Sequence, residues 1–177
     1  MSSDSMRQYN AVDVWGGGVI AAIVAGIAMG VILHFGADLI EVLGGLAPIA
    51  GASIGLGWLI HMLISVGFGL VFAAIVSRRT MRRSLTSFTD FVIAGLAFGA
   101  FIGILAGGVV FPVAMARAGV VALPLPFLPI PGAAGEFVVA VIFAIGHLVY
   151  GLVLGATFAT INGATPVGLE DRIAVLE

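Results

Sequence analysis

The chain of 177 residues contains no cysteine and no lysine, and only 9% of its residues are charged. The absence of cysteine excludes disulfides, thiolate metal sites, iron–sulfur clusters and cysteine nucleophiles. The shortage of charge, beside 61% hydrophobic residues, leaves too few polar side chains to cover a surface in water. A net charge of −2 supplies no concentrated basic surface for phosphates. These shortages exclude a soluble enzyme, a disordered tail and a nucleic-acid-binding protein.

The chain does contain four long apolar segments. A hydrocarbon core about 30 Å thick requires about 20 consecutive apolar residues in a helix. Four windows reach that length without a Lys, Arg, Asp or Glu: residues 14–35, 53–77, 91–116 and 137–161. We therefore expect an all-α membrane protein with four transmembrane helices that form one domain over residues 1–177. The first window is too long for the apolar region of a signal peptide, so we expect it to be retained.

The arginines are unevenly distributed between the two sides of a four-span protein. Four of the seven lie in the connection between the second and third windows: Arg78, Arg79, Arg82 and Arg83. Arg7 and Arg172 fall on the same side, which leaves Arg117 alone on the other. Because basic residues stay in the cytoplasm, we predict a multi-pass plasma-membrane protein with both termini cytoplasmic. The cluster of four is also a candidate for contact with anionic lipid headgroups.

The longest connection, residues 118–135, contains the run LPLPFLPIPG. Repeated proline prevents a helix and favours extended structure. The Leu, Phe and Ile residues between the prolines predict that this connection lies on the membrane surface or against a partner. Since little of the chain lies outside the spans, its expected partners are the lipid bilayer and other membrane subunits or further copies of itself.

The two halves of the sequence resemble each other. VAGIAMGVIL at 24–33 matches IAGLAFGAFI at 93–102, and HMLISVGFGLVFAAI at 61–75 matches HLVYGLVLGATFATI at 147–161. We therefore expect two parallel two-helix repeats, over residues of about 14–77 and 91–161, related by an axis along the membrane normal.

Glycines four residues apart recur in these stretches: Gly26 and Gly30, Gly95 and Gly99, Gly151 and Gly155. This spacing predicts close helix packing through small residues, and its alternative is space for a flat cofactor.

Two histidines occupy matching places in the two halves. His61 and His147 are expected at the same membrane depth, where two imidazoles can ligate one b-type haem. Gly57 and Gly151 lie one turn from these histidines and would leave room for the macrocycle, and Arg117 would meet a propionate. The alternatives are that each histidine is hydrogen-bonded in the interior, or that the pair handles protons or a metal.

A second cluster combines His34, Asp38 and Glu41, at spacings i, i+4 and i+7. If the first helix continues through all three, they share one face and form a candidate site for a divalent metal. Gly36 and the pair at 44–45 weaken such a helix, and the alternative is a solvated loop.

The runs WLIHMLISVGFGLVFA, GAFIGILAGGVVFPVAMA and HLVYGLVLG resemble an uncharacterised prokaryotic family of four-helix integral membrane proteins. Members of that family carry a histidine followed by a glycine-rich face in the second and fourth spans, which correspond to His61 and His147 here. The resemblance implies the fold and the membrane location, and no established activity.

These observations favour a non-catalytic protein: an accessory or binding subunit of a larger membrane complex, for which a respiratory complex is one candidate. The haem between His61 and His147 is its sharpest form. The alternative is a small proton-coupled or solute transporter or channel that uses the intramembrane histidines. An enzyme is disfavoured, because the spans contain neither a nucleophile with its base nor a pair of carboxylates.

Overall fold

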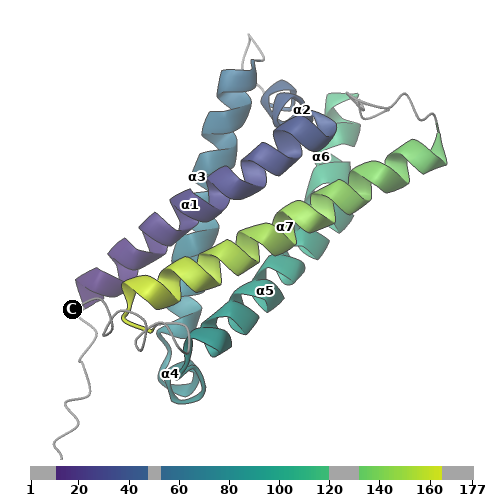
Figure 1. The fold of residues 1–177 in the computed structure, drawn as a ribbon. Coiled ribbons are helices and arrows are strands. Elements are labelled where there is room, and N and C mark those ends of the chain that lie inside the picture. The colour runs from purple at the N-terminus through teal and green to yellow at the C-terminus, as the bar shows by residue number, and fades with distance from the viewer. Residues whose placement is uncertain (1–10, 48–52, 120–131, 165–177) are drawn as a thin grey trace, which may run out of the picture.

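The computed structural model describes residues 11–47, 53–119 and 132–164 (Figure 1). Within these ranges the chain forms helices joined by turns, and no strand. The helices are, in chain order, α1 (Ala11–Ala37), α2 (Leu39–Gly45), α3 (Ile54–Val76), α4 (Arg79–Ser84), α5 (Phe88–Leu105), the π-helix η1 (Ala106–Val110), α6 (Phe111–Ala118) and α7 (Ala133–Ile161). Arg7, Arg172 and all but the last residue of the LPLPFLPIPG run lie outside the described residues, and so do the predictions made for them.

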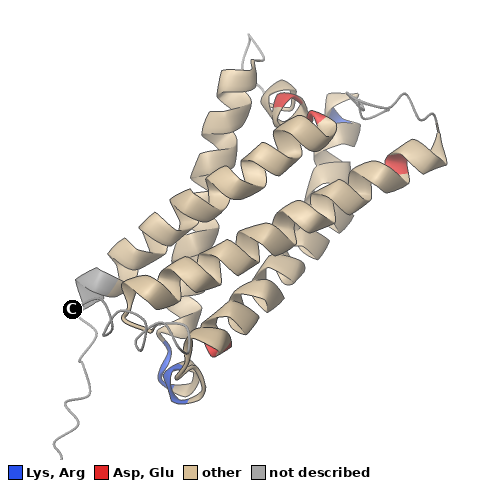
Figure 2. Ribbon diagram, in the orientation of Figure 1, with Lys and Arg blue, Asp and Glu red and all other residues tan. Residues whose placement is uncertain are grey.

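Four stretches are long and apolar enough to cross a membrane: Val14–Ala37, Ile54–Val76, Phe88–Ala118 and Ala133–Ile161. The expected all-α membrane fold with four transmembrane helices is thereby confirmed, and with it a multi-pass protein in contact with the lipid bilayer. Charged side chains lie near the two ends of the helices and leave the middle free of charge (Figure 2). The start of α1, the end of α7 and α4 all lie at one end, and α2 lies at the other (Figure 1).

Serine side chains fix where two of the long helices begin. The hydroxyl of Ser53 accepts a hydrogen bond of 3.1 Å from the Leu56 N–H at the start of α3. At the start of α5, the Ser87 hydroxyl accepts from the Asp90 N–H at 3.2 Å, and the Asp90 carboxylate accepts from the Ser87 N–H at 2.8 Å. This reciprocal capping satisfies N–H groups that have no partner within the helix. The third span therefore begins earlier than the predicted residue 91.

The third span is not the single regular helix that the sequence predicts. It passes from α5 through the π-helix η1 into α6, whose second residue is Pro112. Proline has no N–H to donate, and its ring displaces the carbonyl one turn earlier. A π-turn just before the proline absorbs this mismatch by widening the helix.

The chain turns sharply at the α2 end of α1. Asp38 adopts φ 49° and ψ 21°, and it is the one non-glycine residue with positive φ in the described part of the chain. This left-handed conformation ends α1 at Ala37 and directs the chain into α2, which packs against α3. The packing is close, because a Cβ on Gly57 would overlap the carbonyl oxygen of Ile40.

The long helices pack in the order α3, α1, α7, α5. α1 packs against both α3 and α7, and α7 packs against α5, whereas the backbones of α3 and α5 approach each other at few points. We call the half of the bundle next to α4 the α4 half, and the half next to α2 the α2 half. In the α4 half, aromatic rings fill the space between α3 and α5: the Phe72 ring lies 5.5 Å from the Phe98 ring and 5.6 Å from the Phe158 ring.

The helices of each hairpin cross through small residues at corresponding positions. Close approaches include Gly26 with Ser65 and Gly69 with Ala22 in the first hairpin, and Gly95 with Gly151 and Gly155 with Phe91 in the second. Residues of α5 are numbered 69 above their matches in α1 (93 against 24), and those of α7 are 86 above α3 (147 against 61). With these offsets, the contact of Gly26 with Ser65 corresponds to that of Gly95 with Gly151, and the contact of Gly69 with Ala22 corresponds to that of Gly155 with Phe91.

Candidate functional site

His61 lies on α3 and is held against α1. Its Nε2 is 2.9 Å from the carbonyl oxygen of Gly26, and only 5% of the residue is exposed. The Trp58 ring stands edge-on to the imidazole, with ring centres 5.9 Å apart. Gly30 makes room for this arrangement, since a Cβ there would overlap the Trp58 ring and lie 3.1 Å from His61 Cδ2. The imidazole is therefore fixed by α1 and by a residue of its own helix.

His147 lies on α7 and is held by its own helix. Its Nδ1 is 2.9 Å from the carbonyl oxygen of Phe143, one turn earlier, and the Phe143 ring lies 4.3 Å from the imidazole. On the α5 side, a Cβ on Gly103 would lie 2.9 Å from the Cβ of His147, so the small residue allows the histidine to approach α5. Only 5% of His147 is exposed.

Tyr150 connects α7 to α3 across the middle of the bundle. Its hydroxyl donates a hydrogen bond of 2.6 Å to the carbonyl oxygen of Ser65, and the residue is fully buried. Hydrogen bonds between membrane helices stabilise by about 0.6 kcal/mol on average and about 1.7 kcal/mol at most. No sequence motif predicts a role for Tyr150, although its place three residues after His147 puts both on one helix face.

These side chains surround a cavity of about 350 Å³ in the α2 half, which we call the central cavity. His61, Ser65, His147 and Tyr150 supply its polar groups, and the rest of its wall is apolar. Phe68 borders it toward the α4 half, and Ile64 of α3 and Leu105 of α5 line it where those helices stand apart. Both of these residues are nearly half exposed, so the cavity opens sideways between α3 and α5.

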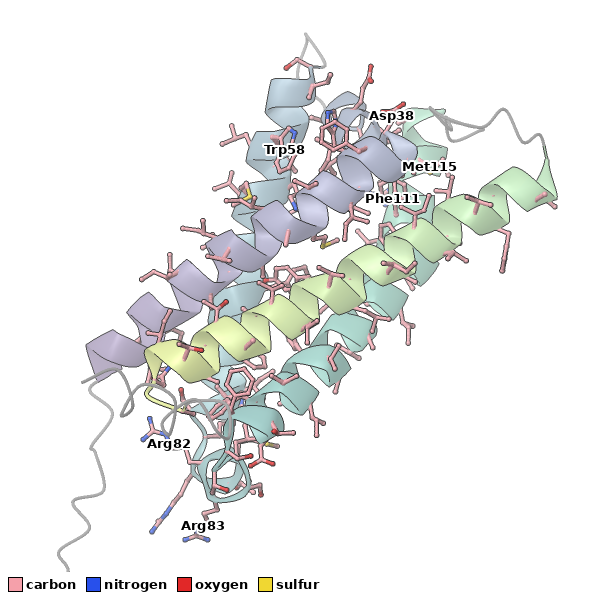
Figure 3. All side chains as sticks on the ribbon, in the orientation of Figure 1. Asp38, Trp58, Arg82, Arg83, Phe111 and Met115 are labelled. Carbon is pink, nitrogen blue, oxygen red and sulfur yellow. The ribbon has the colours of Figure 1, made fainter. Side chains whose placement is uncertain are left out.

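A second space of about 840 Å³, which we call the groove, lies between η1 and α6 on one side and α7 on the other. Phe111 and Met115 line it from α6 (Figure 3), and Glu136 lines it near the start of α7. Phe143 and His147 line both this groove and the central cavity. His147 therefore stands at the wall that the two spaces share.

The other residues predicted to hold a haem lie elsewhere. The space beside Gly57 is filled by the backbone of α2, and a Cβ on Gly151 would overlap the carbonyl oxygen of Gly95. Neighbouring backbones thus occupy the space beside both glycines, so this geometry offers no support for the prediction that they leave room for a macrocycle. Arg117 is exposed on α6 and does not line the central cavity.

The structure does not assemble the predicted cluster of His34, Asp38 and Glu41. The turn at Asp38 interrupts the helix on which the shared face depended. Among the described residues, no group of three His, Asp or Glu side chains is placed to hold a metal ion. The His34 ring instead contacts the rings of Phe35 and Trp58, at 4.7 and 6.1 Å, and its buried Nδ1 finds no hydrogen-bond partner within residues 11–47, 53–119 and 132–164.

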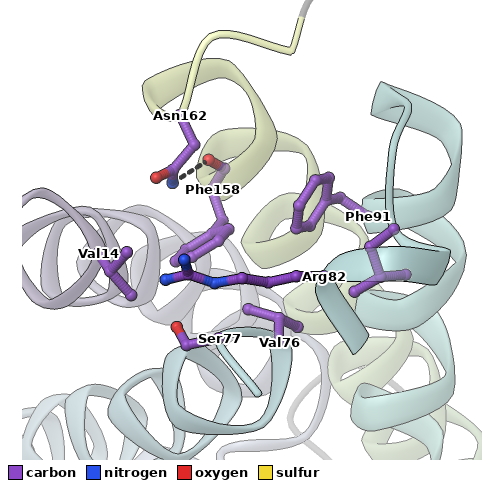
Figure 4. A pocket seen from close by; sticks show the side chains of 8 residues that line it. Val14, Val76, Ser77, Arg82, Phe91, Phe158 and Asn162 are labelled. Carbon is purple, nitrogen blue, oxygen red and sulfur yellow. Dashed lines mark hydrogen bonds between the residues drawn. The ribbon is translucent and has the colours of Figure 1, made fainter. Parts of the chain in front are cut away.

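One member of the arginine cluster reaches into the end of the bundle. The Arg82 side chain extends over a small pocket of about 60 Å³, between Ser77 and Phe158 (Figure 4), whereas Arg83 points away from the helices (Figure 3). At the pocket's rim, Asn162 Nδ2 donates a hydrogen bond of 2.7 Å to the Phe158 carbonyl. This volume holds a few water molecules at most, so Arg82 closes the α4 end of the bundle.

No protein-family model matches the chain, and neither a curated protein nor a solved structure does. The resemblance to a family of four-helix membrane proteins therefore rests on the sequence runs that suggested it.

Proposed function

We propose that this protein is a non-catalytic membrane subunit that binds a lipid-soluble molecule in the central cavity. One observation carries the proposal: two fixed imidazoles, together with Ser65 and Tyr150, border a cavity whose other lining residues are apolar. Each imidazole uses one nitrogen on a backbone carbonyl, and in the described part of the chain no hydrogen bond reaches the other nitrogen. Apolar pockets with a few convergent polar groups are the usual form of small-molecule sites.

A b-type haem between His61 and His147 is a narrower form of this function. His61 Nε2 is already hydrogen-bonded to the Gly26 carbonyl, and backbone atoms lie beside Gly57 and Gly151, so neither feature supports a macrocycle there. The cavity volume of about 350 Å³ is also near the lower end of the range for ligand pockets. Both observations favour a smaller ligand, and an absorbance spectrum of the purified protein tests the haem directly.

A proton-coupled or solute transporter is the second candidate. In its favour, each of His61 and His147 has one ring nitrogen without a hydrogen bond in the described part of the chain, and such a nitrogen can accept a proton. A transport path must continue through the α4 half. There the Phe72 ring packs against the rings of both Phe98 and Phe158. This arrangement supports binding in the α2 half over passage through the bundle.

The remaining predictions on architecture form part of the proposal. The corresponding glycine contacts of the two hairpins support one domain built from two repeats. The unequal packing, in which α1 contacts α7 while α3 and α5 stand apart, departs from an exact two-fold arrangement. The apolar outer surface is suited to lipid, to other subunits of a larger complex or to a second copy of the chain.

The orientation is tested most simply by cysteine labelling, because the natural chain has no cysteine. The arginines of α4 support a cytoplasmic α4 end in the plasma membrane. We expect Thr80→Cys to react with a membrane-impermeant maleimide only after the cells are opened, and Glu41→Cys to react in intact cells after the outer layers are made permeable. The reverse pattern would contradict cytoplasmic termini.

Copurification tests the binding function. The protein is extracted in mild detergent, its absorbance spectrum is recorded, and organic extracts are analysed by mass spectrometry. We expect a lipid-soluble compound at close to one molecule per chain, without a Soret band. Ile64→Trp should remove most of this compound, because the larger ring enters the opening between α3 and α5.

Ile93→Trp is the matched control, since Ile93 is 59% exposed on α5 and lines neither the cavity nor the groove. It should retain the compound at the wild-type level. Equal retention by Ile64→Trp and wild type, or extracts containing only bulk membrane lipid, would count against binding in the cavity. A Soret band in the wild-type protein that disappears in the double variant His61→Ala, His147→Ala would instead support a haem between the two histidines.

A further inference from the structure

The hydrogen bonds of the two histidines determine which ring nitrogen carries the proton. His61 Nε2 and His147 Nδ1 each lie 2.9 Å from a backbone carbonyl oxygen. A carbonyl oxygen only accepts hydrogen bonds, so both of these nitrogens must be donors. A neutral imidazole has a single N–H, and its second nitrogen is therefore an acceptor. His61 Nδ1 and His147 Nε2 each carry a lone pair.

The neutral form is the one that fits this site. No Asp, Glu, Lys or Arg is among the residues that line the central cavity. A charged imidazole buried there without a counter-charge would be strongly disfavoured. Glu136 lines the neighbouring groove, but eleven residues along α7 separate it from His147, about 16 Å in a helix.

Tyr150 and Ser65 are the other polar side chains that line the cavity. The Tyr150 hydroxyl gives its proton to the Ser65 carbonyl. The Ser65 hydroxyl lies against α1, since a Cβ on Gly26 would be 2.9 Å from its Oγ. His61 turns its Cδ2–Nε2 edge to the same helix, which leaves Nδ1 on the opposite edge, away from α1. The two imidazoles thus present two fixed acceptors to a ligand.

From this arrangement we infer that the ligand of the central cavity is a lipid-soluble phenol, whose hydroxyl donates a hydrogen bond to His61 Nδ1 or His147 Nε2. The inference rests on the proposed binding function and specifies its ligand. An aromatic ring suits the wall, because Phe68, Phe111 and Phe143 line the cavity. A volume of about 350 Å³ accommodates the ring and a short part of a chain, and the opening beside Ile64 and Leu105 gives the rest of the chain a path into the lipid.

A pair of probes that differ only in the donor tests this assignment: 4-nonylphenol and its methyl ether. Binding to the protein in phosphatidylcholine nanodiscs is followed through Trp58, which contacts His61, in a Trp15→Phe background that leaves it the only tryptophan. Empty nanodiscs give the baseline for partition into lipid. We expect the phenol to bind roughly tenfold more tightly than the ether, as one additional hydrogen bond provides.

His61→Phe and His147→Phe remove the two acceptors and keep an aromatic ring. In at least one of them the preference for the phenol should fall to about one, while binding of the ether stays unchanged and shows that the cavity is intact. His34→Phe is the control, because His34 lines neither the central cavity nor the groove. This variant should keep the full preference for the phenol over the ether.

The outcomes separate the inference from the function on which it rests. If the wild-type protein binds the ether as tightly as the phenol, or if the preference survives in both histidine variants, the hydroxyl donor is wrong and the binding site stands. If neither probe binds above the baseline of empty nanodiscs, the proposed binding function fails as well.

Discussion

The α4 half and the α2 half of the bundle are built from the same four spanning helices, yet only one is closed. In the α4 half the Phe72, Phe98 and Phe158 rings pack at centre distances below 6 Å and fill the space between helices. In the α2 half the corresponding space is a cavity bordered by two histidines. Both halves have apolar walls, so the difference arises from the size and placement of side chains.

This difference shows how a membrane protein can keep a cavity without a polar surface. Close approach of α5 and α7 depends on glycines, and aromatic rings span the remaining gap between α3 and α5 in the α4 half. In the α2 half the third span becomes a π-helix, and no aromatic pair bridges α3 and α5 among the described residues. A space remains there, and Tyr150 marks its boundary.

The largest effect is expected where the closed half is opened. Phe72→Ala removes a fully buried ring, so we expect it to lower the free energy of unfolding by about 3–5 kcal/mol. Ile64→Ala, on the same helix at the edge of the cavity, should cost less than about 1 kcal/mol, because Ile64 is 46% exposed. Unfolding in mixed micelles with increasing denaturing detergent measures both. Equal losses would remove the distinction between the halves.

An intermediate effect is expected at the glycine contacts. A Cβ on Gly95 would overlap the carbonyl oxygen of Gly151, so Gly95→Ala must push α5 away from α7, at a cost of about 1–3 kcal/mol. Gly67→Ala is the matched control, because nothing lies within 4 Å of the added carbon. Alanine's higher helix propensity should make that variant neutral or more stable by up to about 1 kcal/mol. The same unfolding assay decides, and a stable Gly95→Ala protein would contradict the close packing.

The smallest effect is expected at the boundary of the two halves. Tyr150→Phe removes the hydrogen bond to the Ser65 carbonyl and keeps the ring, so we expect a loss of about 0.6–1.7 kcal/mol. The freed carbonyl should also accept a hydrogen bond from a ligand and thereby weaken the preference for the histidine nitrogens. A stability change above about 3 kcal/mol would mean that Tyr150 contributes mainly through packing of its ring.

The sequence predicted the parts of the fold that depend on hydropathy. Long apolar runs locate the four spans. With four spans, the connection that carries Arg78 and Arg79 must lie at the same end of the bundle as the start of α1 and the end of α7, and it does. The limits of the third span were missed, because the capping pair of Ser87 and Asp90 was assigned to a loop. The effect of Pro112 within that span was overlooked as well, although the residue itself was visible.

The site was only partly predictable. The repeated stretches singled out His61 and His147, and both line the central cavity. Their hydrogen-bond partners and the link from Tyr150 to α3 depend on which face each helix turns inward. In a soluble protein the alternation of polar and apolar residues reveals that face, but these helices are apolar all round. The roles predicted for Gly57 and Gly151 depend on the same choice of face, and backbone atoms lie beside both glycines.

The unequal lengths of the helices make the protein sensitive to membrane thickness. α7 has 29 residues and is about 44 Å long, whereas α3 has 23 residues and measures about 35 Å. Against a hydrocarbon layer of about 30 Å, α7 must lean more than α3 or project farther into the headgroups. A thicker bilayer lets α7 stand more upright, and the tie at Tyr150 then acts as a pivot. We therefore expect the width of the lateral opening to depend on the chain length of the surrounding lipid.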